Sequence, residues 1–304
     1  MKFRRLTPGD FPRLAPYFEG QRHELCSYSL VTILVWDNPL HHPHGAEEGG
    51  VLYVRSGFVR KGRKDFLFLP VARDREFSPA EVARAASRAK VDRVGFVPGG
   101  WIERHGRAEV KKFFTVRSTP GFHDYLYPTR DLAELAGNRY HKKKNLVAQF
   151  EKAYVARGRA AVEPVGPGNR DDCLSFLAEW CRERDCGSVE HSSLACERLA
   201  IENSLENLEI LPVQGIAVRV DGKVSAFAMS SRITDGVGDL NFEKAFAGIK
   251  GLYQYLDRES ARTILSPYAW TNKESDMGLP GLRQAKLSYL PARMVTSHSL
   301  VLKK

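Results

Sequence analysis

Residues 272–289 bring carboxylate, amide and basic side chains together directly after a run typical of a β-strand. Glu274 or Asp276 could accept a proton from an amine or hydroxyl nucleophile. Arg283 or Lys286 could bind a carboxylate or a phosphate. Loops that follow strands often carry functional residues, although a solvated helix face with surface ion pairs would produce the same pattern.

A further carboxylate, Glu243, stands beside Lys244 at the end of an apolar, strand-like run. Partial burial would raise the pKa of Glu243 and suit it to general-base catalysis near neutral pH. A structural ion pair is an equally weighted alternative for this carboxylate.

The glycines that follow this run could form a phosphate-binding turn at the start of a helix. Gly248, Lys250 and Gly251 would place backbone N–H groups where the helix dipole favours an anion. Their spacing matches neither the Walker loop nor the dinucleotide fingerprint, so a packing or capping glycine pair is the alternative.

A basic run covers residues 139–145, where Lys143, Lys144 and Asn145 could hold phosphates of a tRNA acceptor stem or of a lipid. The chain of 304 residues has 46 Lys and Arg against 36 Asp and Glu, a formal net charge of +10. Such a surplus attracts anionic partners, but solubility and a solvent-exposed helix face are the alternative explanations.

Metal and covalent hydrolase chemistry have little support in the sequence. Neither the histidines of residues 41–44 nor Cys181, Cys186 and His191 have a standard zinc spacing, so no metal is predicted. The chain has no Gly-x-Ser-x-Gly elbow, which disfavours covalent hydrolase chemistry.

The sequence also favours a cytoplasmic protein. Five cysteines, an odd number, indicate reduced thiols rather than a disulfide framework. The longest strongly apolar run, residues 30–36, is far too short to span a bilayer, so no transmembrane segment is predicted. The charged start of the chain is followed by Thr7-Pro8-Gly9-Asp10 instead of the apolar region of a secretory signal.

Hydrophobic periodicity predicts the elements that would position these residues. Strands are expected at residues 30–36, 51–54, 66–71, 94–97, 238–242 and 266–271, with a hairpin turning at Asp221-Gly222. Helices are expected after Asp10, after the cap at Ser78, and at residues 140–155, 172–183, 194–208 and 249–261. This mixed order predicts an α+β or mixed α/β fold.

The most linker-like stretch of the chain, residues 156–168, is rich in glycine. It predicts a domain boundary that separates residues 1–158 from residues 159–304, with the active site in the second domain.

Many of these residues also form motifs that occur together in one bacterial family. The motifs run in order along nearly the whole chain and comprise Ser29, Trp36, Tyr125-Leu126-Tyr127, residues 132–145, Phe150, Glu243-Lys244-Ala245, Lys250-Gly251, and residues 272–278 and 282–289. On these residues the chain closely resembles the phosphatidylglycerol lysyltransferase C-terminal domain family, formerly a domain of unknown function. The resemblance implies two tandem GNAT-like (acyl-CoA N-acyltransferase) domains, each a central mixed sheet flanked by helices. Fem-type peptidyltransferases, which move an amino acid from aminoacyl-tRNA to a peptidoglycan amine, have the same arrangement.

The chain departs from the family pattern at several positions. Membrane-bound lysyltransferases carry a large transmembrane region with no counterpart in this sequence, so the resemblance does not imply lysyl transfer to phosphatidylglycerol. Lys144 and Lys273 stand where the family commonly has arginine, which keeps the charge but loses bidentate geometry. Ser275 replaces a common second acid, so Asp276 or Glu274 would have to serve as the base.

These observations lead to the hypothesis of an acyl or aminoacyl transferase in which an amine or hydroxyl acceptor attacks an activated ester or thioester. Acyl-CoA or aminoacyl-tRNA would be the co-substrate, with no tightly bound cofactor. The catalytic residues would be Glu243, Glu274 and Asp276. The phosphates of the donor would contact Gly248, Lys250 and Gly251. The substrate-binding residues would be Asn272, Arg283, Lys286, Tyr289, Lys143, Lys144 and Asn145. The alternative is a catalytically degenerate GNAT-fold module that binds RNA or anionic lipid surfaces.

Overall fold

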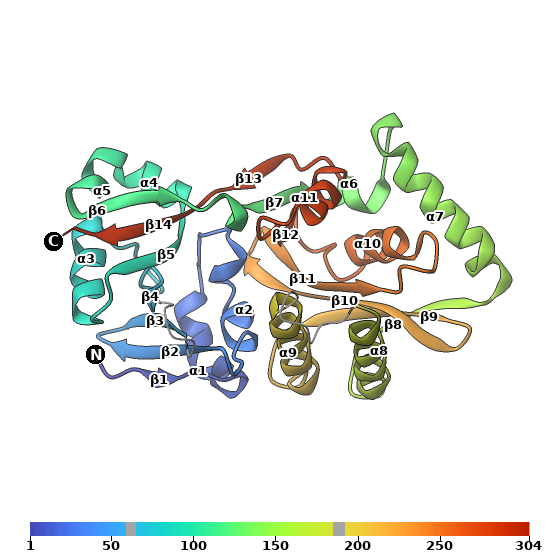
Figure 1. Ribbon diagram of the computed structural model, residues 1–304, viewed down its shortest axis with the longest axis horizontal. Helices are drawn as coiled ribbons and strands as arrows, with labels where there is room; N and C mark the ends of the chain where they lie inside the picture. Colours follow the sequence, from blue (N-terminus) through green and yellow to red (C-terminus); the bar gives the residue numbers. More distant parts are fainter. Residues whose placement is uncertain (59–64, 185–191, 304) are drawn as a thin grey trace.

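The computed structural model describes residues 1–58, 65–184 and 192–303. Within these ranges the chain forms two seven-stranded mixed sheets that lie one after the other along the long axis of the molecule (Figure 1). Helices flank both sheets. The predicted mixed α/β class, with two central mixed sheets flanked by helices, is confirmed.

The first sheet is formed mainly by the N-terminal third of the chain. In spatial order its strands are β1 (Arg4–Arg5), β2 (His41–Glu48), β3 (Val51–Phe58), β4 (Phe66–Leu67), β5 (Arg93–Pro98), β14 (Ser297–Leu302) and β6 (Phe114–Ser118). The helices of this half are α1 (Phe11–Leu14), α2 (Leu30–Val35), α3 (Pro79–Arg88), α4 (Gly99–His105) and α5 (Arg107–Phe113).

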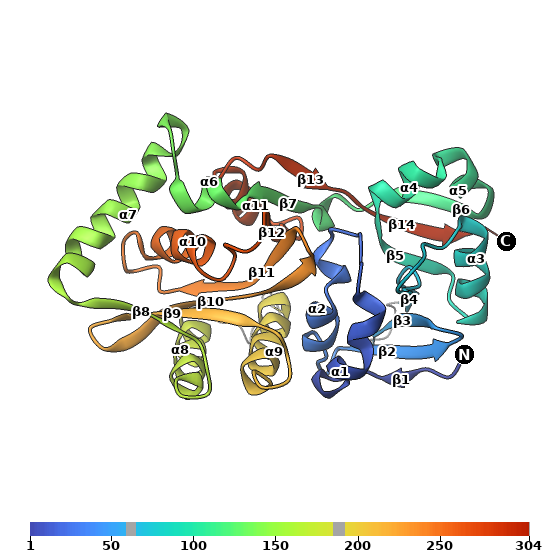
Figure 2. The same ribbon diagram turned by 180° about the vertical axis from the view of Figure 1, so that it is seen from behind.

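The second sheet contains the residues expected to form the active site. Its order is β13 (Arg293–Val295), β7 (Asp124–Pro128), β12 (Trp270–Ser275), β11 (Val237–Ala245), β10 (Lys223–Thr234), β9 (Gln214–Val220) and β8 (Ala160–Pro164). Its helices are α6 (Thr129–Glu134), α7 (His141–Ala153), α8 (Arg170–Glu183), α9 (Ser192–Glu206), α10 (Leu252–Arg262) and α11 (Pro280–Leu287). Figures 1 and 2 show α8 and α9 on one face of this sheet and α7 and α10 on the other.

The two sheets exchange strands. After β6 the chain crosses to the second sheet, where β7 pairs with β12 and β13; after β13 it crosses back, and β14 inserts between β5 and β6. The two crossing segments contact each other: Thr119 N donates to Ser297 O at 3.1 Å, and Ser297 N donates to His123 Nδ1 at 3.0 Å. The predicted boundary at residue 158 lies between α7 and β8, so β7 precedes it and β14 follows it.

Hydrophobic packing also connects the two halves. One core cluster contains Leu34 of α2, Phe66 of the first sheet, and Phe176 and Phe227 of the second half. A second cluster fills the opposite face of the second sheet, where Phe150 of α7 packs with other buried side chains beneath α10. A shared core of this kind holds the two sheets in one arrangement.

Several local expectations are confirmed. The hairpin turns at Asp221-Gly222, with Val220 opposite Lys223. Helix α3 begins at a capping box in which Ser78 and Glu81 bond each other's backbone N–H groups.

The strand predicted at residues 30–36 is wrong, because these residues form α2. Ser29 caps this helix by accepting a hydrogen bond from Thr32 N at 3.5 Å. Every residue of α2 is buried, so the run is apolar on all sides and lacks the one-sided pattern of a surface helix. Part of the linker-like stretch is also ordered, since β8 pairs along its length with β9.

Candidate active site

The candidate site lies where two parallel strands of the second sheet separate. β11 and β12 pair only from Val237 opposite Trp270 to Asp239 opposite Asn272. Beyond this point β11 continues beside β10 as far as Ala245, whereas β12 no longer pairs with it. The two strands therefore diverge toward the start of α10, which follows β11. We define the cleft as the region between their diverging ends.

A buried cluster of charges occupies this cleft. Lys273 of β12 places its Nζ 2.6 Å from Asp257 Oδ2 of α10 and 3.3 Å from Glu243 Oε2 of β11. The side chains of Lys273 and Asp257 are only 10% and 4% exposed. Two carboxylates thus share one ammonium group in a region largely removed from water.

Burial raises the pKa of Glu243 to about 7, and the charge of Asp257 adds to the rise although Lys273 opposes it. Burial opposes protonation of Lys273, but Asp257 and Glu243 outweigh it and raise the pKa of the amine. Lys273 therefore stays charged at neutral pH, while Glu243 is close to the midpoint of its titration. A carboxylate in that state can accept a proton from a nucleophile.

An aromatic ring and a second lysine complete the cluster. The ring of Tyr289 lies 4.7 Å from Lys273 Nζ and 4.0 Å from Lys143 Nζ. Tyr140 OH donates to Tyr289 O at 3.3 Å and connects the start of α7 to the segment after α11. Burial lowers the pKa of the Lys143 amine. Of the basic run, Lys143 joins the cleft, whereas Lys144 and Asn145 are exposed on α7.

Two of the predicted site residues have their polar groups engaged within the protein. Asn272 donates to Asp124 Oδ2 at 2.9 Å, and its Oδ1 accepts from Glu274 N at 2.6 Å. Asp276 accepts from Tyr125 OH at 2.5 Å and Arg283 Nε at 2.8 Å. These geometries fit residues that shape the turn between β12 and α11.

The pKa of Asp276 is also too low for a base that must accept a proton at neutral pH. Burial favours its neutral form, but hydrogen bonds from Arg283, Tyr125 and Gly278 outweigh burial and lower the pKa of Asp276. A carboxylate held ionised by three donors is a weak proton acceptor at neutral pH. Of the three predicted catalytic acids, Asp276 therefore fits a structural role.

Glu274 has a different environment. Its backbone has a φ of 56°, a conformation that is rare outside glycine. In the part of the chain that the structure describes, no hydrogen bond or ion pair engages its carboxylate. Burial raises the pKa of Glu274 well above its usual value, and Asp239 and Asp124 add to the rise.

Asp239 and Asn241 lie on β11 in the same acidic region. Asp239 Oδ2 accepts from Thr32 Oγ1 at 3.2 Å and from Asn241 Nδ2 at 2.9 Å. The remaining oxygens, Asp239 Oδ1 and Asn241 Oδ1, are buried without a hydrogen-bond partner within residues 1–58, 65–184 and 192–303. Buried acceptors of this kind have unused capacity for a donor group.

The predicted phosphate loop lies between β11 and α10, beside the cleft. Gly248 and Lys250 are exposed, and Gly251 begins α10 with a φ of 83° and no side-chain cap. A Cβ at Gly251 would lie 2.2 Å from Leu146 O of α7, so this position requires glycine for packing. The packing alternative therefore accounts for Gly251, and the open helix start is still able to receive an anion.

Lys286 and Arg283 extend from α11. Lys286 Nζ donates to the Lys273 carbonyl, and burial lowers the pKa of this amine although Glu274 opposes the change. Tyr127 OH donates to Lys286 O at 2.8 Å, which ties the end of α11 to β7.

Sequence reasoning did not select Asp257 or Asp239. Asp239 had a detectable signal, because it is a charged residue within an otherwise apolar strand run. Asp257 had none, since it lies beside Arg258 in a helix that resembles a surface helix. Lys273 was noted only as a departure from the family pattern.

In the described residues no group of three or more His, Cys, Asp and Glu side chains is placed to hold a metal ion. Cys186 and His191, considered above for zinc, lie outside those residues. No described helix is long and apolar enough to cross a membrane.

Fold and cleft together define a tandem mixed α/β protein in which one sheet opens onto a buried charged cluster. The sequence profile of the family described as "Phosphatidylglycerol lysyltransferase, C-terminal" matches residues 59–297. The chain therefore belongs to this family, as its motifs predict.

Individual proteins resemble this chain in sequence or in fold. A conserved protein of unknown function from Bacteroides thetaiotaomicron is 26% identical to this chain and superimposes on it with a TM-score of 0.87. The match covers 100% of both chains. The C-terminal domain of a candidate lysylphosphatidylglycerol synthetase from Agrobacterium fabrum is 16% identical, with a TM-score of 0.61 over 87% of this chain and 85% of that domain, and shows a shared fold. An uncharacterized protein of Mycoplasmoides gallisepticum is 26% identical over 55% of this chain and 52% of its own length, so the match spans about half of that relative.

Proposed function

We propose that this member of an acyltransferase-related family moves an activated acyl or aminoacyl group onto an amine or hydroxyl acceptor in the cleft between β11 and β12. The observation that carries the proposal is Glu243, a carboxylate with a pKa of about 7 beside the charged amine of Lys273. Acyl transfer needs a base for the nucleophile and positive charge near the developing oxyanion. Glu243 and Lys273 supply these two functions.

In the proposed reaction Glu243 takes a proton from the acceptor as its nitrogen or oxygen attacks the donor carbonyl carbon. The Lys273 ammonium, 3.3 Å from Glu243, stabilises the negative oxygen of the tetrahedral intermediate. Collapse of the intermediate breaks the ester or thioester bond. The proton on Glu243 then passes to the leaving oxygen or sulfur, so Glu243 ends the cycle ionised.

The donor would be aminoacyl-tRNA or acyl-CoA, both of which carry phosphates. The start of α10 at Gly248, Lys250 and Gly251 is available for these phosphates, and the exposed Lys144 and Asn145 of α7 would extend the contact. Burial raises the pKa values of Glu274 and Asp239 well above their usual values, which favours their neutral forms. The unpartnered Asp239 Oδ1 and Asn241 Oδ1 would therefore accept hydrogen bonds from an uncharged acceptor amine or hydroxyl.

The direct test is turnover by Glu243→Gln, with the exposed Glu209→Gln as a matched control. Donor classes are first separated by thermal shift with acetyl-CoA, longer acyl-CoAs, and charged and uncharged tRNA, because a ligand of the folded state raises the melting temperature. With the stabilising donor, Glu243→Gln should lower kcat about 100-fold or more, and Glu209→Gln should not. Undiminished turnover in Glu243→Gln would remove this carboxylate from the mechanism.

The second candidate function is a binding module without turnover. Its support is that Lys273, Asp257 and Glu243 already neutralise one another inside the cleft. This alternative predicts salt-dependent binding of tRNA regardless of charging, with no effect of CoA esters. Neutralising Lys142 and Lys144 should then reduce the slope of log affinity against log salt.

A further inference from the structure

The chain passes between the two sheets through two segments that lie side by side (Figures 1 and 2). Within the described residues these segments are residues 119–123, between β6 and β7, and Thr296, between β13 and β14. Thr119 N donates to Ser297 O at 3.1 Å, and Thr119 Oγ1 donates to Ser297 Oγ at 3.0 Å. Ser297 N donates to His123 Nδ1 at 3.0 Å. We define the joint as Thr119, His123, Thr296 and Ser297.

The hydrogen bond to His123 requires a neutral ring. An imidazole nitrogen accepts a hydrogen bond only while it carries no proton, so the neutral ring of His123 has its proton on Nε2. Protonation would add a second N–H at Nδ1, which would face the N–H of Ser297. Because Ser297 is fully buried, its N–H would then lose its only acceptor at the joint away from water, which costs free energy.

The surroundings of His123 favour the neutral ring. Burial lowers the pKa of His123 below its usual value of 6.5, although the charge of Asp276 opposes this change. Arg283 donates to the Asp276 carboxylate at 2.8 Å and compensates part of that negative charge. The ring of His298 on β14 lies 6.3 Å from the ring of His123, so two charged rings would repel each other.

The second ring of the pair is equally unprepared for positive charge. Within the described residues His298 Nδ1 is buried without a hydrogen-bond partner. Burial and the neighbouring His123 lower the pKa of His298, whereas the carbonyl of Val97 raises it. Of the charged side chains on this side, Arg107 lowers the pKa and Glu103 raises it. The joint is therefore built around two neutral imidazoles.

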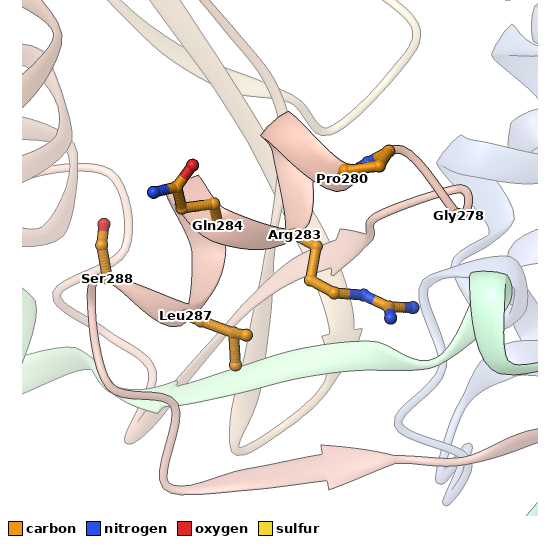
Figure 3. A pocket seen from close by; sticks show the side chains of 6 residues that line it. All are labelled: Gly278, Pro280, Arg283, Gln284, Leu287 and Ser288. Carbon is orange, nitrogen blue, oxygen red and sulfur yellow. The ribbon is translucent and has the colours of Figure 1, made fainter.

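The joint also contacts the turn that leads from β12 to α11. A Cβ at Gly121 would lie 3.0 Å from Gly278 N, so the crossing segment and this turn are closely packed. Gly278 and Arg283 line the surface pocket beside α11 (Figure 3). The turn follows directly on β12, the strand that carries Lys273 into the cleft. A displacement at the joint would therefore reach the candidate active site.

We propose that the joint is an acid-sensitive connection between the two sheets, which opens when His123 takes up a proton. In the neutral state the ring holds Ser297 N and keeps the two crossing segments together. In the protonated state the ring releases Ser297 N, the segments separate, and the packing of Gly121 against Gly278 is lost. The proposal goes beyond the transfer reaction, because opening of the joint requires no step at Glu243.

Hydrogen exchange of the full chain measures the joint directly. Overlapping peptides that cover residues 293–302 resolve the amide of Ser297 by mass spectrometry. After correction for the intrinsic exchange rate, protection of this amide in the wild type should fall at least about tenfold between about pH 7.5 and about pH 5.5. Such a loss would show that acid opens the joint while the rest of the protein stays folded.

Two substitutions separate the titration of His123 from its packing. In His123→Asn the side-chain oxygen can accept the hydrogen bond in place of Nδ1 but does not titrate in this range, so protection should stay high at both pH values. His123→Leu lacks an acceptor and should lose protection at both pH values. His141→Asn, at the exposed start of α7, is the matched control and should behave like the wild type.

Stability provides a second measurement with a defined sign. Because burial lowers the pKa of His123 from 6.5, the unfolded chain binds this proton more tightly than the folded protein does. The contribution of neutral His123 to the free energy of unfolding is thus complete above pH 6.5 and is lost as the pH falls below it. His123→Asn should remove this part of the acid-induced loss, and His141→Asn should not.

Three results would overturn the proposal. These are equal wild-type protection of Ser297 at the two pH values, the same acid-induced loss in His123→Asn as in the wild type, and full protection in His123→Leu. Circular dichroism at neutral pH establishes that each variant is folded, and His123→Asn decides the question if His123→Leu does not fold. Glu243→Gln should keep the wild-type exchange pattern, so failure of the joint and failure of the transfer reaction are distinguishable.

Discussion

Both sheets contain a pair of parallel strands that diverge after a short contact. The two openings between the diverging strands are filled by different kinds of side chains. In the first sheet β4 and β5 pair only at Leu67 opposite Val94. In the second sheet β11 and β12 separate after Asp239 and Asn272. The comparison shows that the same backbone arrangement can become either a packed core or a charged cleft.

Aromatic rings fill the first opening. Phe68 and Phe96 stack with ring centroids 5.8 Å apart, Phe66 lies 5.4 Å from each of them, and Phe122 lies 5.4 Å from Phe96. The contacts among these four rings are apolar and supply no group that could activate a substrate. The second opening instead contains Lys273 and its two carboxylates. Of the two openings, the second therefore holds the ionisable cluster.

The helices that follow the openings differ in the same way. Helix α3 of the first half starts at the reciprocal capping box of Ser78 and Glu81, which satisfies its N-terminal N–H groups. Helix α10 starts at Gly251 without a side-chain cap. Of these two helix starts, only that of α10 lacks a side-chain acceptor for its N-terminal N–H groups.

The largest expected effect on stability comes from replacing Lys273. Lys273→Met would leave Asp257 and Glu243 buried without a cation and should lower the free energy of unfolding by about 3–5 kcal/mol at neutral pH. Lys273→Arg should retain most of that stability. Denaturant unfolding of both variants provides the measurement, and equal stability of Lys273→Met and wild type would show that the cluster is not a buried ion network.

An aromatic substitution tests the first opening. Phe68→Ala should lower the free energy of unfolding by about 3 kcal/mol, because it leaves a cavity among the stacked rings. Turnover measured below the melting temperature should match wild type. A fall in kcat for this variant would place catalytic function in the first opening as well.

The pH dependence of activity should report Glu243. Because burial raises its pKa to about 7, kcat/KM should rise about tenfold per pH unit below pH 7 and level off above it. A pH profile without an inflection near 7 would contradict the role of Glu243 as the base.

The contribution of Glu243 to the free energy of unfolding should fall as the pH rises, whereas kcat/KM should increase. The folded protein holds the Glu243 proton between the usual pKa of 4.5 and about 7, where the unfolded chain has lost it. The contribution of Glu243 is thus complete below pH 4.5 and is lost as the pH rises through about 7. Glu243→Gln should remove this part of the decline in unfolding free energy, and an unchanged decline would contradict the assignment.

The smallest expected effect concerns the cap of α3. Ser78→Ala should cost about 1 kcal/mol of stability by removing the side-chain acceptor. The stabilisation of the protein by its phosphate-bearing donor should be unchanged, since the donor is expected at α10. Thermal shift with and without donor measures both quantities, and a weaker donor effect would indicate a phosphate site at α3.

Locally encoded features were accessible from sequence. Ser78 followed by Glu81 predicts the start of α3, and Asp221-Gly222 between alternating runs predicts the hairpin of β9 and β10. Glu243 was also selected as a candidate base, because a carboxylate at the end of an apolar strand is expected to be partly buried. In each case the signal lies within a few residues.

Other features depend on contacts between distant parts of the chain. Residues 30–35 have strand-like composition, yet burial against α9 and β10 makes them a helix. The exchange of β7 and β14 has no local signal, because it is decided by which sheet edge each strand meets. Hydrogen bonds at the crossing join residues as far apart as Thr119 and Ser297.

The sequence by itself determined the mixed α/β class, the family, and the residue types available for acyl transfer. Only the tertiary structure decided that Glu243 meets Lys273 and Asp257, that Asp276 is held by three donors, and that aromatic rings close the first opening. The physical reason is that a side chain's charge state and reactivity depend on its desolvation and on the charges that long-range folding places beside it.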